Sequence, residues 1–235
     1  FGGSIPGPAD GAFPSVDAAT WLALAHEAGA RARQMNGPML PLELADWFAR
    51  RGWRVRQHQS DMLAAAEAGR HALLVADTGA GKTLAGFLPT LAAFCPSRGE
   101  LPPDGLHTLY VSPLKALAHD VQRNLMTPIE EIGLPLRVET RSGDTPADRK
   151  RRQRTRPPHV LLTTPESLSL LLSYPESLEL FAGLRRVVVD EIHAFATGKR
   201  GDLLAPALSR LQTIAPGMQR AALSAGVADP GGVRA

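Results

Sequence analysis

The sequence predicts a three-layer α/β domain in which helices cover both faces of a mostly parallel sheet. Short apolar segments rich in β-branched residues alternate with longer helix-like segments, and this alternation is typical of right-handed βαβ units. The expected strands are residues 71–76, 107–112, 136–140, 159–163, 185–190 and 219–224. The expected helices are residues 58–68, 82–94, 115–131, 146–154, 165–173 and 202–213.

The N-terminal part of the chain differs in composition from this alternating region. Residues 1–15 are rich in Gly and Pro, which predicts a disordered leader. Residues 17–35 form an amphipathic helix pattern opened by Asp17, and a further helix is expected over residues 41–51. We therefore divide the chain into residues 1–40, a flexible leader with a helical extension, and residues 41–235, the α/β domain.

Bulk properties restrict the class of protein. A chain of 235 residues with 44% hydrophobic content suits one large domain with an extension. The formal charge of +3 permits a nucleic-acid partner without requiring one. Cys95 is the single cysteine, so no internal disulfide is expected. No apolar run of about 18 residues and no signal peptide are visible, which predicts a cytoplasmic protein without a membrane partner. A start at Phe1 and an end soon after the last strand suggest a piece of a longer protein.

The string ADTGAGKT, residues 76–83, lies between an apolar strand pattern and the start of a helix pattern. Glycines there allow a tight turn whose N–H groups, together with the helix N-terminus, can hold a phosphate. A lysine adds charge for the β- and γ-phosphates, and a threonine hydroxyl can ligate Mg²⁺. The first position is Ala76 instead of the usual Gly, so a chance Gly-rich turn is the alternative. The predicted cofactor-binding residues of this loop are Thr78, Gly79, Ala80, Gly81, Lys82 and Thr83.

A second chemical motif follows the valine-rich strand expected at residues 185–190. Asp190 and Glu191 stand at its carboxyl end, where open α/β sheets bind ligands. Asp190 is suited to hold Mg²⁺ through water, and Glu191 is suited to orient or deprotonate an attacking water. His193 is expected to link this site to neighbouring motifs. The predicted catalytic residues are thus Lys82, Asp190, Glu191 and His193, with Thr83 and Asp190 at the metal; a solvated acidic pair is the alternative.

Three further strings occur at expected strand ends: SPLKAL at 112–117, RSGDTP at 141–146 and TTPESL at 163–168. Taken in order with ADTGAGKT, DEIH and GKRGD, they resemble the first RecA-like domain of a superfamily 2 DExH-box helicase of the large-helicase-related type. Within that type, the bacterial ligase-associated DEXH-box DNA helicases are the nearest subgroup. The resemblance covers about residues 43–231.

The resemblance implies a RecA-like P-loop NTPase fold that uses ATP and Mg²⁺. It also implies ATP hydrolysis that drives 3′-to-5′ movement on single-stranded or partly duplex DNA, in bacterial DNA repair. A second RecA-like domain in cis would complete the site, and a DNA ligase and a nuclease are partners by family analogy. Gln59 matches the family's adenine-reading glutamine, whose amide can pair with adenine. Trp53 or Phe48 could add a ring there, although such aromatics are more often core residues.

Strand-end loops and helix N-termini can bind backbone phosphates without reading bases. The residues predicted to contact a nucleic-acid strand are Pro113, Lys115, Arg141, Thr145, Thr164, Glu166, Lys199 and Arg200. Each alone has a solvated surface role as its alternative. The basic run at residues 149–156 is either a helix that faces DNA or a solvated helix face.

The chain departs from the family at the motif that couples hydrolysis to strand movement. Gly226 stands where the family usually has Thr, which puts coupling in doubt and leaves ATP binding untouched. No second RecA-like domain follows in this sequence, and an arginine finger can be worth about 10³–10⁵ in rate. We therefore expect the isolated chain to bind nucleotide weakly, hydrolyse it poorly and fail to unwind. The alternatives are an RNA helicase, or a truncated, inactive nucleotide- and nucleic-acid-binding module.

Overall fold

The computed structural model describes residues 40–77, 79–113, 115–195 and 199–225. The expected leader, the helix expected at 17–35, Thr78 and Gly226 lie outside these ranges. In the described part no helix is both long enough and apolar enough to cross a membrane.

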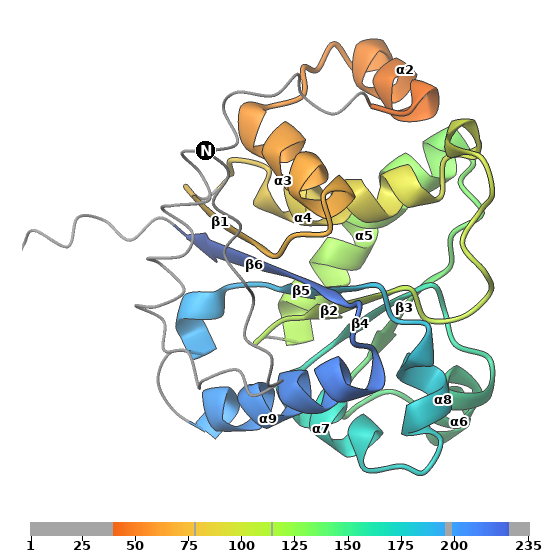
Figure 1. The fold of residues 1–235 in the computed structure, drawn as a ribbon, viewed down its shortest axis with the longest axis vertical. Helices are drawn as coiled ribbons and strands as arrows, with labels where there is room; N and C mark the ends of the chain where they lie inside the picture. The colour runs from red at the N-terminus through yellow and green to blue at the C-terminus, as the bar shows by residue number, and fades with distance from the viewer. Residues whose placement is uncertain (1–39, 78, 114, 196–198, 226–235) are drawn as a thin grey trace, which may run out of the picture.

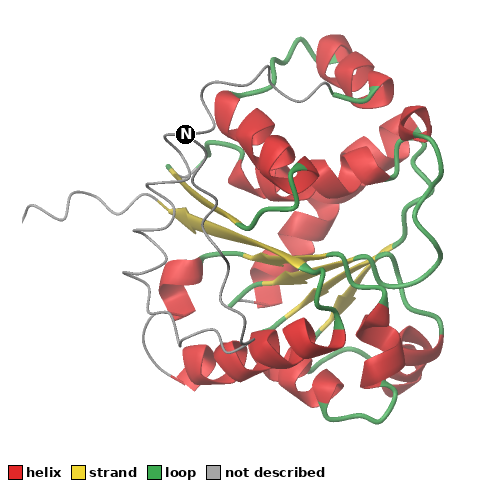
Figure 2. Ribbon diagram, viewed as in Figure 1, coloured by secondary structure: helices red, strands yellow, loops and turns green. Residues whose placement is uncertain are grey.

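A six-stranded sheet forms the centre of the domain, with strand order β1-β6-β5-β2-β4-β3 (Figures 1 and 2). Every adjacent pair in this order is parallel. The strands are β1 Ala72–Ala76, β2 Thr108–Val111, β3 Val138–Arg141, β4 Val160–Thr163, β5 Arg186–Val189 and β6 Gln219–Ala225. All the expected strands are therefore confirmed, with ends that differ by one or two residues.

Helices cover the two faces of this sheet, as Figure 1 shows. On one side lie α2 Leu42–Arg50, α3 Gln57–Glu67, α4 Lys82–Ala93 and α5 Lys115–Ile132. On the other lie α6 Ala147–Thr155, α7 Pro165–Leu172, α8 Ser177–Ala182 and α9 Lys199–Ile214. Two short 3₁₀ helices, η2 Pro96–Arg98 and η3 Ile192–Phe195, complete the described elements. Helix α8 was not predicted, and α9 begins earlier than expected.

Two hydrophobic cores separate the layers because side chains along a strand alternate between its faces. Val188 of β5 packs with Phe87 and Tyr110 in the core under α3, α4 and α5. Its neighbours Val187 and Val189 pack in the core under α7 and α9. Because β5 is buried on both faces, its sequence is a continuous apolar run instead of an alternating one.

Candidate functional site

The parallel sheet brings all the predicted motifs to one edge, since every strand ends on the same side. Along this edge the order of strand ends is β1, β6, β5, β2, β4 and β3, with neighbours about 4.8 Å apart. We call the ends of β1, β6 and β5 the P-loop half, because they carry the glycine loop, Ser224 and the acidic pair. The ends of β2, β4 and β3 form the distal half, which carries SPLKAL, TTPESL and RSGDTP.

The glycine loop has the backbone that the sequence predicts. Gly79 and Gly81 have φ of 80° and 77°, in the left-handed region that favours glycine. Gly81 is also the N-cap of α4. The Lys82 side chain folds over the loop, where its Nζ donates to the carbonyl oxygens of Ala76 at 2.7 Å and Asp77 at 3.0 Å. These carbonyl oxygens hold the ammonium at the mouth of the loop, in place for an anionic ligand.

The start of α3 lies against the glycine loop. Gln59 is 4% exposed, and its Oε1 accepts a hydrogen bond from the Arg56 backbone N–H at 3.0 Å. A Cβ added to Gly81 would lie 3.1 Å from Gln59 Nε2, so only a glycine fits easily here. Arg56 Nη1 approaches the Gly79 carbonyl oxygen at 3.4 Å. The predicted adenine-reading glutamine therefore adjoins the predicted phosphate loop.

The two aromatic candidates for the same site occupy different environments. Phe48 is 4% exposed and belongs to the core under α3, α4 and α5. This is the core role given above as the alternative to adenine contact. Trp53 is 50% exposed and packs edge-to-face on Trp47, with 5.6 Å between ring centroids. Of these two rings, only that of Trp53 is exposed to solvent.

The Asp190 carboxylate is held from two sides. Its Oδ1 accepts the Glu191 backbone N–H at 2.9 Å, and its Oδ2 accepts a short hydrogen bond from the hydroxyl of Tyr110. Asp190 is 6% exposed and Tyr110 is fully buried. Burial, reinforced by the nearby Asp190 carboxylate, raises the pKa of Tyr110 well above its ordinary value. Sequence reasoning missed Tyr110, although it lies in an expected strand.

Glu191 has a backbone that is unusual for its residue type. Its φ of 50° makes it the single non-glycine residue with positive φ among the described residues, and such strain is concentrated at functional sites. Its Oε2 lies 3.3 Å from His193 Nε2. The other ring nitrogen of His193, Nδ1, lies 3.1 Å from Ser224 Oγ on β6. His193 thus contacts both the acidic pair and β6, while its expected role as a link between motifs stays a prediction.

In the distal half, Arg141 does not lie where we predicted. Its side chain is 1% exposed, and Nη1 donates to the Lys150 carbonyl oxygen at 2.8 Å and to Gln153 Oε1 at 3.3 Å. Burial also lowers the pKa of this guanidinium. The structure therefore contradicts the prediction that its side chain faces a nucleic-acid strand: it attaches α6 to the end of β3.

The other distal residues have mixed environments. Pro113 and Thr164 are buried, and Thr164 Oγ1 caps α7 by accepting the Ser167 N–H at 3.4 Å. Thr145 Oγ1 accepts the Ser142 N–H at 2.9 Å. Both hydroxyls therefore stabilise the loops that were predicted to bind phosphates.

The exposed charges near these loops include a pair that was predicted as separate contacts. Arg200 Nε lies 3.0 Å from Glu166 Oε1, and both side chains are about half exposed, at 48% and 49%. Lys115 and Lys199 begin α5 and α9, but their side chains are outside what the structure describes. Of these predicted cations, Arg200 is therefore the exposed one whose side chain the structure describes, and it is paired with Glu166.

The basic run 149–156 forms α6 and part of its C-terminal turn. Arg149 and Arg152 both pair with Glu139, at 3.3 Å and 2.7 Å. Arg154 lies 3.7 Å from Glu176, with its guanidinium 4.1 Å from the centre of the Tyr174 ring. These internal pairs favour the alternative that we left open, a solvated helix face.

The residues of the P-loop half fit ATP with Mg²⁺. In the described ranges no three His, Cys, Asp or Glu side chains form a metal site. Mg²⁺ often binds through one or two protein oxygens together with substrate phosphates and water. The Thr83 hydroxyl and the buried Asp190 carboxylate would supply such oxygens, and the Lys82 ammonium at the glycine loop would balance phosphate charge.

Comparison with known proteins agrees with this geometry. The family model for DEAD/DEAH box helicases matches residues 56–230. The chain is 44% identical over 196 residues to a protein named Lhr helicase/probable uracil glycosylase from Mycolicibacterium smegmatis. This alignment covers 79% of this chain and 13% of that protein. The chain is 38% identical over 195 residues to the ATP-dependent helicase Lhr-Core of Methanothermobacter thermautotrophicus, covering 78% and 22%.

A solved structure of Mycobacterium smegmatis helicase Lhr bound to ssDNA and AMP-PNP superimposes with a TM-score of 0.71 at 42% identity, covering 81% of this chain and 25% of that one. These comparisons confirm the RecA-like fold and the large-helicase-related type. The ligase-associated subgroup stays a prediction. The chain spans between 13% and 22% of the length of the curated relatives it matches, and it belongs to the DEAD/DEAH box helicase family.

Proposed function

We propose that this chain is the ATP-binding part of a DNA helicase or translocase. It binds ATP with Mg²⁺ in the P-loop half and the backbone of single-stranded nucleic acid along the distal half. The observation that carries this proposal is the strand order, which sets the Lys82 loop, Ser224 and the Asp190–Glu191 pair on the neighbouring strands β1, β6 and β5. Relatives named ATP-dependent helicases support it.

Each residue of the P-loop half has a role in this proposal. The N–H groups of Gly79 to Gly81 and the N-terminus of α4 bind the triphosphate. The Lys82 ammonium exchanges its hydrogen bonds to the Ala76 and Asp77 carbonyl oxygens for hydrogen bonds to phosphate oxygens. Thr83 and Asp190 would hold Mg²⁺, which would supply neutralisation of the charge that develops during phosphoryl transfer.

The acidic pair and its histidine supply the remaining chemistry. Glu191 orients the attacking water and accepts its proton at the side-chain carboxylate. His193 contacts both Glu191 and Ser224. In this proposal it couples changes at the nucleotide site to movement of β6. Gln59, which adjoins Gly81, selects adenine through its side-chain amide.

The distal half gives the proposed partner. Single-stranded or partly duplex DNA would run over the ends of β2, β4 and β3, and Arg200 contributes charge without reading bases. The proposal also includes a role in DNA repair in the cytoplasm, a second RecA-like domain in cis, and a DNA ligase and a nuclease as partners. These parts rest on the resemblance alone. If the binding test below shows tighter binding of RNA than of DNA, RNA replaces DNA as the proposed substrate.

The sharpest test of the catalytic assignment is Glu191→Gln in the full-length protein that contains this chain. ATP turnover should fall by roughly 10²–10⁴-fold, because a positioned general base contributes that much. AMP-PNP binding should remain, since the amide keeps the side-chain volume. Glu176→Gln, at an exposed carboxylate near α8, is the matched control and should leave turnover unchanged. Turnover that survives Glu191→Gln would remove the role of this residue as the base.

The strand-binding assignment is tested by the salt dependence of oligonucleotide affinity. Arg200→Ala should reduce the slope of log affinity against log salt by roughly 0.7, the value for one contact with a single strand. Arg149→Ala is the control: Arg149 is likewise an exposed, paired arginine, with Glu139, but we do not place it on the strand path, so its variant should leave the slope unchanged. An equal slope for wild type and Arg200→Ala would contradict strand contact by Arg200. Parallel titrations with DNA and RNA of one sequence distinguish the two substrates.

A further inference from the structure

We propose that Tyr110 is a positioning residue for Mg²⁺ in the ATP site, acting through the Asp190 carboxylate. The proposal rests on the function proposed above and adds a residue to it. Tyr110 lies in β2, a strand whose end we assigned to the distal half. It therefore joins the two halves beneath the edge of the sheet.

The register between β2 and β5 explains the contact. Tyr110 pairs with Val188, and paired residues of parallel strands face the same side. Asp190 lies two residues beyond Val188, so it also points to that side. A long side chain can reach the residue diagonally opposite it. The Tyr110 hydroxyl does so, and it donates a hydrogen bond to Asp190 Oδ2.

The rest of the Tyr110 side chain is fixed by packing. Its ring stacks on Phe87 with 5.0 Å between centroids and 22° between planes. Phe87 belongs to α4, the helix that starts at Lys82. The tyrosine is fully buried, so the hydroxyl has a defined position relative to the phosphate loop.

The consequence is a carboxylate with a restricted orientation. One oxygen of Asp190 is held by Tyr110 and the other by the Glu191 N–H. The lone pairs that remain are directed to a narrow set of positions at the edge of the sheet. Residues that orient a metal-binding carboxylate in this way typically change metal affinity by about 10- to 100-fold when removed.

The test is Mg²⁺-dependent binding of AMP-PNP to the 235-residue chain, measured with Tyr110→Phe. This change removes one oxygen atom and keeps the ring that stacks on Phe87. The Mg²⁺ concentration at half-maximal AMP-PNP binding should rise by about 10-fold. Binding of AMP-PNP in EDTA should stay at the wild-type level, a result that a merely structural role would not give.

Tyr174→Phe is the matched control because Tyr174 is the other of the two tyrosines in the sequence. It lies against Arg154, away from Asp190, and its variant should keep the wild-type Mg²⁺ midpoint. In an Asp190→Asn background, Tyr110→Phe should have no further effect, because the carboxylate through which it acts is gone.

Three results would overturn the inference. The first is a wild-type Mg²⁺ midpoint for Tyr110→Phe, and the second is an equal loss in the Asp190→Asn background. Either one leaves the proposed ATP site intact. The third is wild-type AMP-PNP binding that is independent of Mg²⁺, which would overturn the proposed function as well. If Tyr110→Phe does not fold, a crystal structure of the unmodified chain with AMP-PNP and Mg²⁺ decides, since Asp190 turned away from Tyr110 would contradict the proposal.

Discussion

The carboxyl and amino edges of the same sheet use their polar residues differently. At the carboxyl edge, Gly79, Gly81 and Glu191 have left-handed backbones, and the Lys82 ammonium is held by main-chain carbonyl oxygens alone. At the amino edge, buried polar side chains bond to one another. We therefore expect the first edge to hold the ligand that we propose and the second to contribute mainly to stability.

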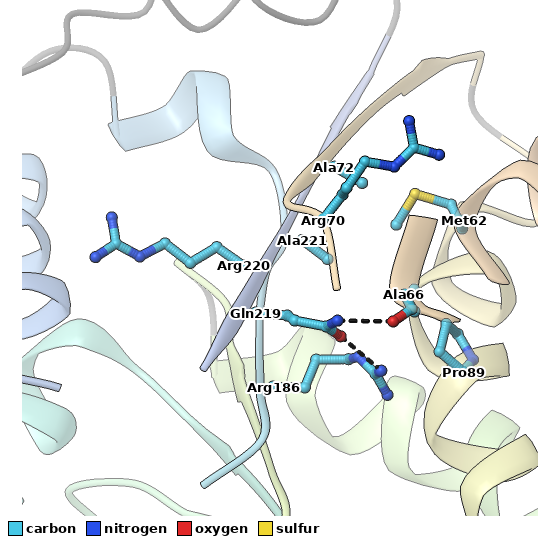
Figure 3. Close-up of a pocket in the computed structure, with 10 residues that line it drawn as sticks. Met62, Ala66, Arg70, Ala72, Pro89, Arg186, Gln219, Arg220 and Ala221 are labelled. Carbon is cyan, nitrogen blue, oxygen red and sulfur yellow. Dashed lines mark hydrogen bonds between the residues drawn. The ribbon is translucent and has the colours of Figure 1, made fainter. Parts of the chain in front are cut away.

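The amino edge contains a buried arginine, shown in Figure 3. Arg186 is 9% exposed, and burial lowers its pKa to about 10. Its Nη2 donates to Gln219 Oε1 at 2.9 Å, and Gln219 Nε2 donates to the Ala66 carbonyl oxygen at 2.7 Å. The adjoining cavity offers only about 10 Å³, which is room for about one water.

A histidine cluster closes the amino edge farther along. His159 Nε2 lies 3.0 Å from Asp104 Oδ1, and its Nδ1 accepts the Arg137 N–H at 3.0 Å. His107 Nδ1 lies 2.8 Å from Thr108 Oγ1. Because these groups satisfy one another, changes here should alter stability and leave ligand affinity intact. The opposite should hold at the carboxyl edge.

The largest expected effect is on nucleotide affinity in Lys82→Ala. Hydrogen bonds to charged groups contribute about 1.5–3 kcal/mol each, so losing two phosphate contacts should weaken AMP-PNP binding by roughly 10²-fold or more. Lys150→Ala is the control, because Lys150 Nζ also donates to a loop carbonyl oxygen, that of Gly143 at 2.8 Å. Titration calorimetry should show normal affinity for the control, and an equal loss in both variants would contradict the assignment.

Acid should lower the free energy of unfolding because it protonates His107, a buried residue at the amino edge. Burial, helped by the charges of Arg186 and Arg185, lowers the pKa of His107 to about 4. The unfolded chain, with a pKa near its usual value of about 6.5, binds more protons in this window. The free energy of unfolding should therefore fall as pH drops from about 6.5 to about 4, by up to ~3 kcal/mol.

Urea denaturation at several pH values measures this slope. His107→Asn should remove most of it, leaving a smaller part from His159 and His71, whose pKa values are also lowered, chiefly by burial. A slope that is the same in wild type and His107→Asn would assign the acid sensitivity to other groups.

Gly201 should break the simple division between the edges. It lies in α9 at the carboxyl edge, and an added Cβ would meet the Phe195 carbonyl oxygen at 2.2 Å. Alanine would gain about 1 kcal/mol in helix propensity, but this backbone clash should cost more, about 2–3 kcal/mol. Gly201→Ala should therefore lower thermal stability by roughly 1–2 kcal/mol. Gly217→Ala, with nothing within 4 Å, is the control; equal stability of both variants would show that η3 moves freely.

Gln219→Ala should cause a loss of stability of similar size. It removes the best acceptor of Arg186 and leaves the Ala66 carbonyl oxygen without its side-chain donor, at a cost of about 1–2 kcal/mol. AMP-PNP affinity should not change. Gln57→Ala, at an exposed glutamine bonded to Asp61, is the control for loss of an amide. A drop in nucleotide affinity in Gln219→Ala would show that the two edges are coupled.

Local sequence patterns predicted the strands, the glycine loop and the acidic pair because their signals lie within a few residues. Helix α8 was missed because six residues are too short for a helical period to show. The prediction that Arg141 contacts a nucleic-acid strand was wrong because the burial of this residue depends on α6. The Lys150 carbonyl oxygen and the Gln153 side chain of that helix accept its hydrogen bonds. Tyr110 was missed because its contact depends on the register between β2 and β5, which sequence patterns do not specify.

The most direct measurement of the central claim is a crystal structure of the chain with AMP-PNP and Mn²⁺, with the metal located by its anomalous scattering. We expect an anomalous peak beside the Thr83 hydroxyl and the Asp190 carboxylate, with the phosphates on the Gly79–Gly81 turn. A metal peak remote from Asp190, or a nucleotide bound at the amino edge beside Arg186, would contradict it.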